Sequence, residues 1–249
     1  MPSSCLKRRA DDVVVVRILS SILDFLAPKL CPGCGRALLS AEEEMCADCL
    51  DECATLPERR CPRCGGPADG LLDECRQCQL EDDDRPWKLA VSAFPFEGKA
   101  RHWIHEFKYR GGLHLAPFLA ERLAVAWRTY GGNEPLDGIV PVPLHWFRRL
   151  TRGYNQTDVL AGLLGRRLGL PKIPCLRRTR RTRQQARMNK EERRRNVRHA
   201  FACRTSPAGR RLLLLDDVFT TGSTLKAATE ALLDGGASSV SVLTIARDL

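Results

Sequence analysis

The chain has 249 residues, of which 43% are hydrophobic, so it is long enough for one large domain or a domain with a small additional module. No apolar run is long enough to cross a bilayer, and we expect no insertion into a membrane. The formal net charge is +10, but residues 1–85 carry 11 Lys and Arg against 17 Asp and Glu, whereas residues 148–211 carry 20 against 3. This excess indicates either a surface that faces phosphate or nucleic acid, or a solvated basic face.

The N-terminal segment, residues 1–30, contains the apolar run VVVVRILSSILDFLAPKL (13–30) after a basic start. It resembles a signal peptide only loosely, because Arg17 and Asp24 interrupt it. Its larger apolar side chains fall on one helical face: Ile18, Ile22, Phe25 and Leu26. We expect an amphipathic helix that packs on the rest of a cytoplasmic protein.

Eight of the twelve cysteines form four Cys-x-x-Cys pairs within residues 31–80. They belong to two successive units, CPGCGRALLSAEEEMCADC and CPRCGGPADGLLDECRQC, whose cysteines are Cys31, Cys34, Cys46 and Cys49, then Cys61, Cys64, Cys75 and Cys78. Paired knuckles at this separation place four thiolates around one Zn²⁺ at roughly 2.3 Å. A redox dithiol or an iron–sulfur cluster fits two matching units less well. We expect a double zinc ribbon over residues 31–80 with two structural zinc ions, in a reducing compartment, and Cys53 as a spare thiol.

After a linker at residues 81–86, strand-like and helix-like stretches alternate to the C-terminus. Strands are expected at residues 88–98, 137–144, 210–217 and 238–249. Helices are expected at residues 99–111, 114–130 and 155–170, and from about residue 224. The alternation predicts an α/β domain over residues 87–249, built on a mostly parallel sheet flanked by helices.

The stretch LLLLDDVFTTGSTL (212–225) joins the third of these strands to the last helix. Ligands of parallel sheets bind beyond the carboxyl ends of the strands, where Asp216 and Asp217 are expected. A glycine-containing loop at a helix N-terminus offers amide N–H groups to a phosphate, and here its residues are Thr220, Thr221, Gly222, Ser223 and Thr224. The carboxylates suit sugar hydroxyls, directly or beside Mg²⁺. The pattern predicts a ribose 5-phosphate ligand; the alternative is a solvent turn with a capping Thr or Ser.

The stretch LLLLDDVFTTGST resembles the phosphoribosyl-diphosphate signature of type I phosphoribosyltransferases. With the cysteine units, FKYRG (107–111), PVPL (141–144) and RGYNQ (152–156), nearly the whole chain resembles the ComF family of double-zinc-ribbon phosphoribosyltransferase-like proteins. The resemblance implies that Asp216 and Asp217 are the catalytic pair that meets the ribose hydroxyls, and that Thr220–Thr224 surround the 5-phosphate. It also implies that the loop around Pro141–Pro143 approaches the diphosphate.

Basic residues elsewhere are candidates for contact with the diphosphate. Lys108 lies at a helix end, and Arg148, Arg149 and Arg152 precede a helix that starts near Asn155; solvent-facing positions are the alternative. The arginine-rich residues 177–201 are expected to form a basic arm or, as the resemblance implies, a mobile hood that closes over substrate. Four of its residues are expected near the site: Gln184, Gln185, Arg195 and Asn196.

The leading interpretation is an enzyme, a phosphoribosyltransferase and therefore a glycosyltransferase. It would bind phosphoribosyl diphosphate with Mg²⁺ and transfer ribose 5-phosphate to an unidentified nitrogen acceptor. The resemblance implies a link with DNA uptake in competence, which makes single-stranded DNA or a protein of the competence machinery candidate partners. Two alternatives stay open, because a fold does not establish activity: a non-catalytic protein that handles nucleic acid or a partner, and a sensor of phosphoribosyl diphosphate without turnover.

Overall fold

The structure is a computed structural model that describes residues 30–38, 40, 43, 45–68, 73–80, 85–109, 111–133, 135–144, 154–179 and 200–249. The chain divides into two compact units, Met1–Glu52 and Cys53–Leu249. The expected N-terminal helix lies outside the described residues. Among the helices that are described, none combines the length and the apolar character that crossing a membrane requires.

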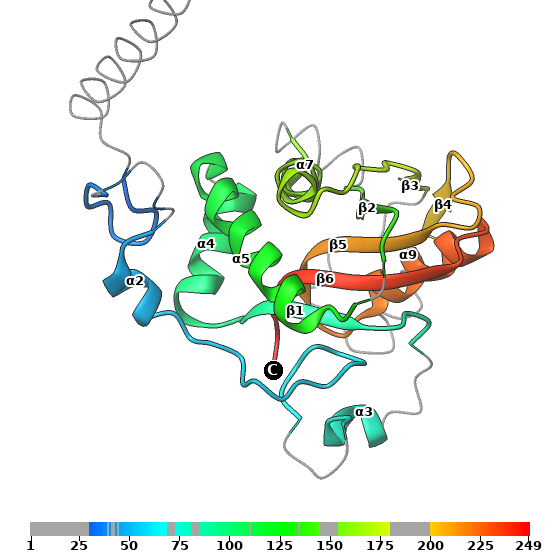
Figure 1. Ribbon diagram of the computed structural model, residues 1–249, viewed down its shortest axis with the longest axis horizontal. Helices are drawn as coiled ribbons and strands as arrows, with labels where there is room; N and C mark the ends of the chain where they lie inside the picture. The colour runs from blue at the N-terminus through cyan, green and yellow to red at the C-terminus, as the bar shows by residue number, and fades with distance from the viewer. Residues whose placement is uncertain are drawn as a thin grey trace, which may run out of the picture. The chain divides into compact units, whose positions relative to one another are not determined.

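The larger unit is built on a four-stranded sheet in the order β1-β6-β5-β2 (Figure 1). Its strands are β1 (Ala90–Pro95), β2 (Gly138–Pro141), β5 (Arg211–Phe219) and β6 (Ser239–Arg247). All three pairings are parallel, with Val91 opposite Leu243, Leu214 opposite Val242 and Val140 opposite Leu214. The two central strands are largely buried on both faces because helices or loops cover both sides of a parallel sheet.

Helices cover the two faces of this sheet (Figure 1). Three helices contact one face: α4 (Gly98–Tyr109), α5 (Ala116–Tyr130) and α7 (Gln156–Leu168). A 3₁₀ turn at Leu113–Leu115 leads into α5. Leu212 and Leu214 point to the other face, because their cluster contains Leu225 and Leu232 of α9 (Ser223–Asp234). Leu213 and Leu215 alternate with them and so point toward the first face.

The arrangement confirms the expected fold class, a parallel sheet flanked by helices, and shows two differences in detail. β5 continues through Asp216 and Asp217 to Phe219, with Asp216 opposite Thr244 and Val218 opposite Ala246. The strand therefore runs two residues further than expected, and the acidic pair lies within it and not at its last position. Because the strand holds their backbone, the direction of both carboxylates is set by the sheet.

The second difference is an antiparallel hairpin that the sequence did not indicate. β3 (Leu176–Arg178) pairs with β4 (Phe201–Cys203), and Arg178 lies opposite Phe201. This pairing brings the two ends of the arginine-rich stretch together beside α9, which contacts both strands. The four residues expected near the site, Gln184, Gln185, Arg195 and Asn196, lie outside the described part of the chain.

Candidate functional site

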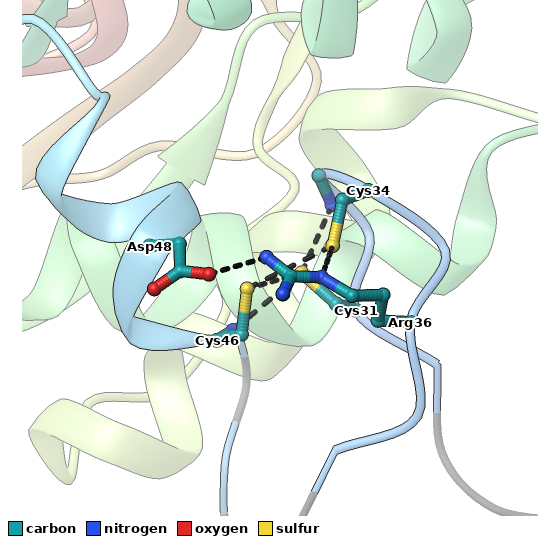
Figure 2. A network of polar contacts seen from close by, with 6 residues as sticks. Cys31, Cys34, Arg36, Cys46 and Asp48 are labelled. Atoms are coloured by element: carbon teal, nitrogen blue, oxygen red, sulfur yellow. Dashed lines mark hydrogen bonds and ion pairs between the residues drawn. The ribbon is translucent and has the colours of Figure 1, made fainter.

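Cys31, Cys34, Cys46 and Cys49 form the first cluster, which lies in the smaller unit. Figure 2 shows the first three of them. Their sulfur atoms all lie within 4.8 Å of one another. Helix α2 (Ala47–Asp51) starts directly after Cys46 and so carries the second pair toward the knuckle that holds the first. The amide of Gly33 donates to the sulfur of Cys31 at 3.4 Å, as in a knuckle that stabilises thiolates.

Arg36 binds Cys34 at the exposed side of this cluster and lowers its pKa. Its Nε donates to the sulfur of Cys34 at 3.3 Å, while its guanidinium also binds the carboxylate of Asp48 (Figure 2). The hydrogen bond from Arg36 lowers the pKa of Cys34 to about 6. The thiolate that binds a metal is therefore the favoured form of Cys34 at neutral pH.

The second cluster, Cys61, Cys64, Cys75 and Cys78, repeats this construction within the larger unit. The amide of the glycine after the knuckle donates to the first cysteine's carbonyl at 2.8 Å in both, from Gly35 and from Gly65. Helix α3 (Arg76–Leu80) carries Cys78 as α2 carries Cys49. The surroundings differ, because Cys61, Cys64 and Cys78 are buried in the core of the larger unit.

The two sets of four cysteines fit two structural zinc ions, since four sulfur ligands leave no open position. Cys53 belongs to neither set.

Metal analysis of freshly purified, reduced protein should therefore find about two zinc ions per chain. Cys34→Ser and Cys75→Ser should each reduce this to about one, because each removes one ligand from a different set. A wild-type value near one would contradict two independent sites.

The residues Thr220–Thr224, which we call the phosphate loop, run from the end of β5 into the first turn of α9. Gly222 is the residue before α9 and has φ +77°, a left-handed conformation that suits glycine. A β-carbon there would lie 3.0 Å from the ring of Phe219. The hydroxyls of Thr221 and Ser223 hydrogen-bond to each other at 2.8 Å. The amides of the first turn of α9 have no partner within the helix, which favours an anion at this point.

The acidic pair is electrostatically asymmetric. Asp217 forms an ion pair with Lys108, at 2.8 Å between Oδ2 and Nζ, with both side chains 20% exposed. Burial raises the pKa of Asp216 to about 7, and the charge of Asp217 adds to the rise. The amide of Asp217, Lys108 and Arg178 act in the opposite direction. A carboxyl with such a pKa is partly protonated at neutral pH, and perturbed pKa values of this kind are common in functional sites.

Two neighbouring segments hold Lys108 in place. The hydroxyl of Tyr154 donates to the carbonyl of Phe107 at 2.8 Å, and the side-chain amide of Gln156 donates to the carbonyl of Lys108 at 3.3 Å. After α4 the chain turns back so tightly that a β-carbon on Gly112 would lie 3.0 Å from the backbone of Phe107. The start of α7 therefore fixes the end of α4, which carries Lys108.

These groups line one cavity of about 200 Å³ beyond the carboxyl ends of β2 and β5. Six of the residues singled out from the sequence meet there: Lys108, Asp216, Asp217, Thr220, Gly222 and Thr224. Val142 and Pro143 line it too, as expected for the loop after β2. Thr221 and Ser223 lie in the same loop but not on the cavity wall. Arg148, Arg149 and Arg152 lie outside the described residues.

The sequence did not single out several residues of this cavity. Arg178 lines it from the end of β3, and Tyr109 and Gln156 line it from α4 and α7. Thr157 also lines it and donates to the carbonyl of Val142 at 2.7 Å, which fixes the loop after β2. The arginine-rich composition indicated a basic segment, but the β3–β4 pairing shows that Arg178, among the described residues of this segment, reaches the cavity.

Comparison with known proteins agrees with this arrangement. Residues 22–79 match the double zinc ribbon domain and residues 159–249 match the phosphoribosyl transferase domain. The DNA utilization protein YhgH of Escherichia coli K12 is 33% identical, over 89% of this chain and 98% of the relative. Competence protein F of Haemophilus influenzae is 30% identical, over 87% of this chain and 96% of the relative.

A more distant relative, competence protein ComFC of Bacillus subtilis, is 27% identical over 84% of this chain and 87% of the relative. Among solved structures, the glutamine phosphoribosylpyrophosphate amidotransferase of B. subtilis matches 57% of this chain and 30% of that chain, at 18% identity and a TM-score of 0.39. The extent of the sequence matches, with a zinc ribbon ahead of a phosphoribosyl transferase domain, shows that this chain belongs to the ComF family.

Proposed function

We propose that the protein binds phosphoribosyl diphosphate with Mg²⁺ and transfers its ribose 5-phosphate to a nitrogen acceptor. The observation that carries this proposal is the single cavity in which the phosphate loop, the acidic pair and Lys108 meet. A ligand with a phosphate at one end and neighbouring hydroxyls in its middle matches an amide-rich loop followed by two carboxylates. The match of residues 159–249 to the phosphoribosyl transferase domain supports the same ligand.

In this proposal each group has a defined role. The amides of the phosphate loop and the hydroxyls of Thr220 and Thr224 bind the 5-phosphate, and Asp216 and Asp217 accept hydrogen bonds from the ribose hydroxyls. In the transfer, the bond from C1 of the ribose to the diphosphate oxygen breaks and a bond from C1 to the acceptor nitrogen forms. Lys108 and Arg178 stabilise the negative charge that develops on the leaving diphosphate.

Carboxylate oxygens are ligands that Mg²⁺ accepts, so the acidic pair fits a magnesium–diphosphate substrate. Bound to the diphosphate, Mg²⁺ would neutralise part of the charge of the leaving group. The pairing of β3 with β4 supports a hood formed by residues 177–201, since Arg178 at its start lines the cavity. Two sets of four thiolate ligands also suit the reducing cytoplasm, where we propose that the protein acts.

A second candidate function is the handling of single-stranded DNA or of a competence-machinery partner without turnover. The names of the relatives, DNA utilization protein and competence protein, favour it. So does the basic stretch at residues 148–211, with 20 Lys and Arg against 3 Asp and Glu. The two functions are compatible in one protein, but they predict different ligands for the cavity.

Calorimetric titration separates the two functions. Phosphoribosyl diphosphate with Mg²⁺ should bind the wild-type chain at micromolar concentration, roughly −8 kcal/mol, and Lys108→Ala should weaken binding by about 1–3 kcal/mol because a charged contact is lost. A screen of nitrogen bases should then find one that raises diphosphate release above the rate of hydrolysis. Failure to bind the sugar diphosphate, together with binding of single-stranded DNA that weakens steeply with salt, would favour the second function.

A further inference from the structure

We propose that the second cluster is the structural support of the phosphate loop, so that metal at this cluster, and not at the first, controls phosphate binding. Trp87 and Arg247 are the positioning residues that connect the two. The inference rests on the proposed function for its phosphate ligand, but the shape of the loop can be measured without any ligand. All the groups involved lie in the larger unit, Cys53–Leu249.

Trp87 forms the first connection. Its indole Nε1 donates to the carbonyl of Arg63 at 2.9 Å, and Arg63 lies in the knuckle between Cys61 and Cys64. The ring of Trp87 then meets the ring of Phe219 edge to face, with centroids 5.7 Å apart at 88°. Only 7% of Trp87 is exposed. The hydrogen bond fixes the indole to the knuckle, and the ring contact in turn fixes Phe219 at the end of β5.

Phe219 and Trp87 together lie directly under Gly222. A β-carbon at Gly222 would be 3.0 Å from the ring of Phe219 and 3.3 Å from the ring of Trp87. The left-handed turn that exposes the loop amides therefore sits on these two rings. Because protein interiors are closely packed, a shift of the Trp87 ring should displace the loop as well.

Arg247 forms the second connection. Its Nη1 donates to the carbonyls of Phe219 at 3.2 Å and Thr220 at 2.8 Å, where the phosphate loop begins. Its guanidinium lies over the Phe219 ring, 4.7 Å from the centroid. The stem of the side chain passes beside the knuckle, since a β-carbon on Gly66 would lie 3.4 Å from the sulfur of Cys64 and 3.7 Å from Cγ of Arg247.

The buried charge of Arg247 also links this residue to the second cluster. Only 4% of this residue is exposed, and within the described residues no carboxylate forms an ion pair with it. A buried cation needs a compensating charge nearby. A zinc ion with four thiolates carries a net charge of about −2, so the metal-loaded second cluster supplies it.

The knuckle of the second cluster is also fastened to the sheet. The amide of Ala90 donates to the carbonyl of Pro62 at 2.7 Å, and a guanidinium nitrogen of Arg60 donates to the carbonyl of Ser92 at 2.7 Å. Cys61, Cys64 and Cys78 belong to the same buried cluster as Phe219 and Leu225. Metal binding at this site is thus coupled to the folding of the surface under the loop.

The test compares one substitution in each cluster, Cys75→Ser and Cys34→Ser, both at positions that are not fully buried. Each variant should retain about one zinc per chain. In Cys75→Ser, amide hydrogen exchange in residues 219–225 should accelerate by at least about tenfold, and affinity for inorganic phosphate should fall by a similar factor. In Cys34→Ser both quantities should stay within about twofold of the wild type.

Trp87→Phe is the second variant, because it keeps all eight cysteines and an aromatic ring but loses the hydrogen bond to Arg63. It should keep about two zinc ions and accelerate exchange in residues 219–225 several-fold. This variant decides the question if Cys75→Ser also unfolds the sheet. Equal exchange in Cys75→Ser, Trp87→Phe and Cys34→Ser would overturn the inference. A wild-type chain that fails to bind phosphoribosyl diphosphate would instead overturn the proposed function, while the exchange comparison still decides the support role.

Discussion

Gly222→Val is expected to abolish binding of both inorganic phosphate and phosphoribosyl diphosphate, with a loss of at least about 100-fold in affinity, or roughly 3 kcal/mol. Gly222 has φ +77°, a conformation in which a β-branched residue costs about 1–3 kcal/mol. The new side chain would also press on the rings of Phe219 and Trp87, at 3.0 and 3.3 Å from its β-carbon. The loop relaxes by moving its amides out of line with the anion.

The control for this substitution is Gly209→Val, in the turn before β5. Gly209 has φ +71°, and a β-carbon there would meet no atom within 4 Å. The variant therefore carries the same backbone strain without disturbing the phosphate loop. Calorimetric titration should show wild-type affinity for Gly209→Val. The melting temperature should fall in both variants, and further in Gly222→Val because its side chain also presses on two buried rings. Retained phosphate binding in Gly222→Val would show that the anion is held elsewhere.

The parts of this site that the sequence predicted are those encoded locally. The apolar run Leu212–Leu215 followed by two acids indicates a buried parallel strand and its ligand-binding end, and the glycine in Thr220–Thr224 indicates the turn into a helix. Both features depend on neighbours within a few residues. The ion pair of Lys108 with Asp217 joins residues 109 positions apart, and only the parallel sheet brings them together.

Other features could not be predicted because their signals are short or ambiguous. β3 and β4 have three residues each, too few for a periodic pattern, so the sequence did not show that Arg178 reaches the cavity. Nothing in the sequence around Arg247 shows whether this side chain is buried or solvated. The role of Arg247 depends on its contacts with the carbonyl groups of Phe219 and Thr220.

The two cysteine clusters show the same limit of local information. Their spacings are almost identical, and the sequence predicts one zinc site for each. Their surroundings are nevertheless opposite, since Cys34 is exposed and the equivalent Cys64 is only 1% exposed. Motif spacing specifies the ligands, whereas burial depends on the sheet and on Trp87, which lies outside the motif. From this difference we expect the loss of each metal to have different consequences.

Asp216→Asn is expected to stabilise the fold at pH 8 while it weakens binding of phosphoribosyl diphosphate. Burial raises the pKa of Asp216 from its usual 3.8 to about 7 in the folded chain. The folded state therefore keeps a proton that the unfolded chain releases as the pH rises above about 4. The stability linked to this proton is complete below pH 4 and is lost as the pH rises through 7. Asparagine cannot ionise, so the variant avoids this loss.

Thermal unfolding at pH 5 and pH 8 measures the effect. Relative to the wild type, the free energy of unfolding of Asp216→Asn should rise by about 1–3 kcal/mol between the two pH values, since each pKa unit corresponds to about 1.4 kcal/mol and solvent at the cavity reduces the full effect.

Asp137→Asn is the control, in which the pKa shift has the opposite sign. The hydrogen bonds and charge of Arg211 lower the pKa of Asp137 to about 2, so its contribution is present above pH 4 and is lost as the pH falls through 2. Asp137→Asn should therefore be less stable than the wild type at both pH values.

The same carboxylate that lowers stability above pH 7 should hold the ribose. Wild-type affinity for phosphoribosyl diphosphate should rise between pH 6 and pH 8 as Asp216 ionises, beyond the change seen for inorganic phosphate. Asp216→Asn should lose this extra pH dependence and bind the sugar diphosphate about 1–3 kcal/mol more weakly, with phosphate affinity almost unchanged. An equal loss for both ligands would mean that Asp216 maintains the loop and does not contact the sugar. A gain in stability with unchanged binding would remove the carboxylate from the site altogether.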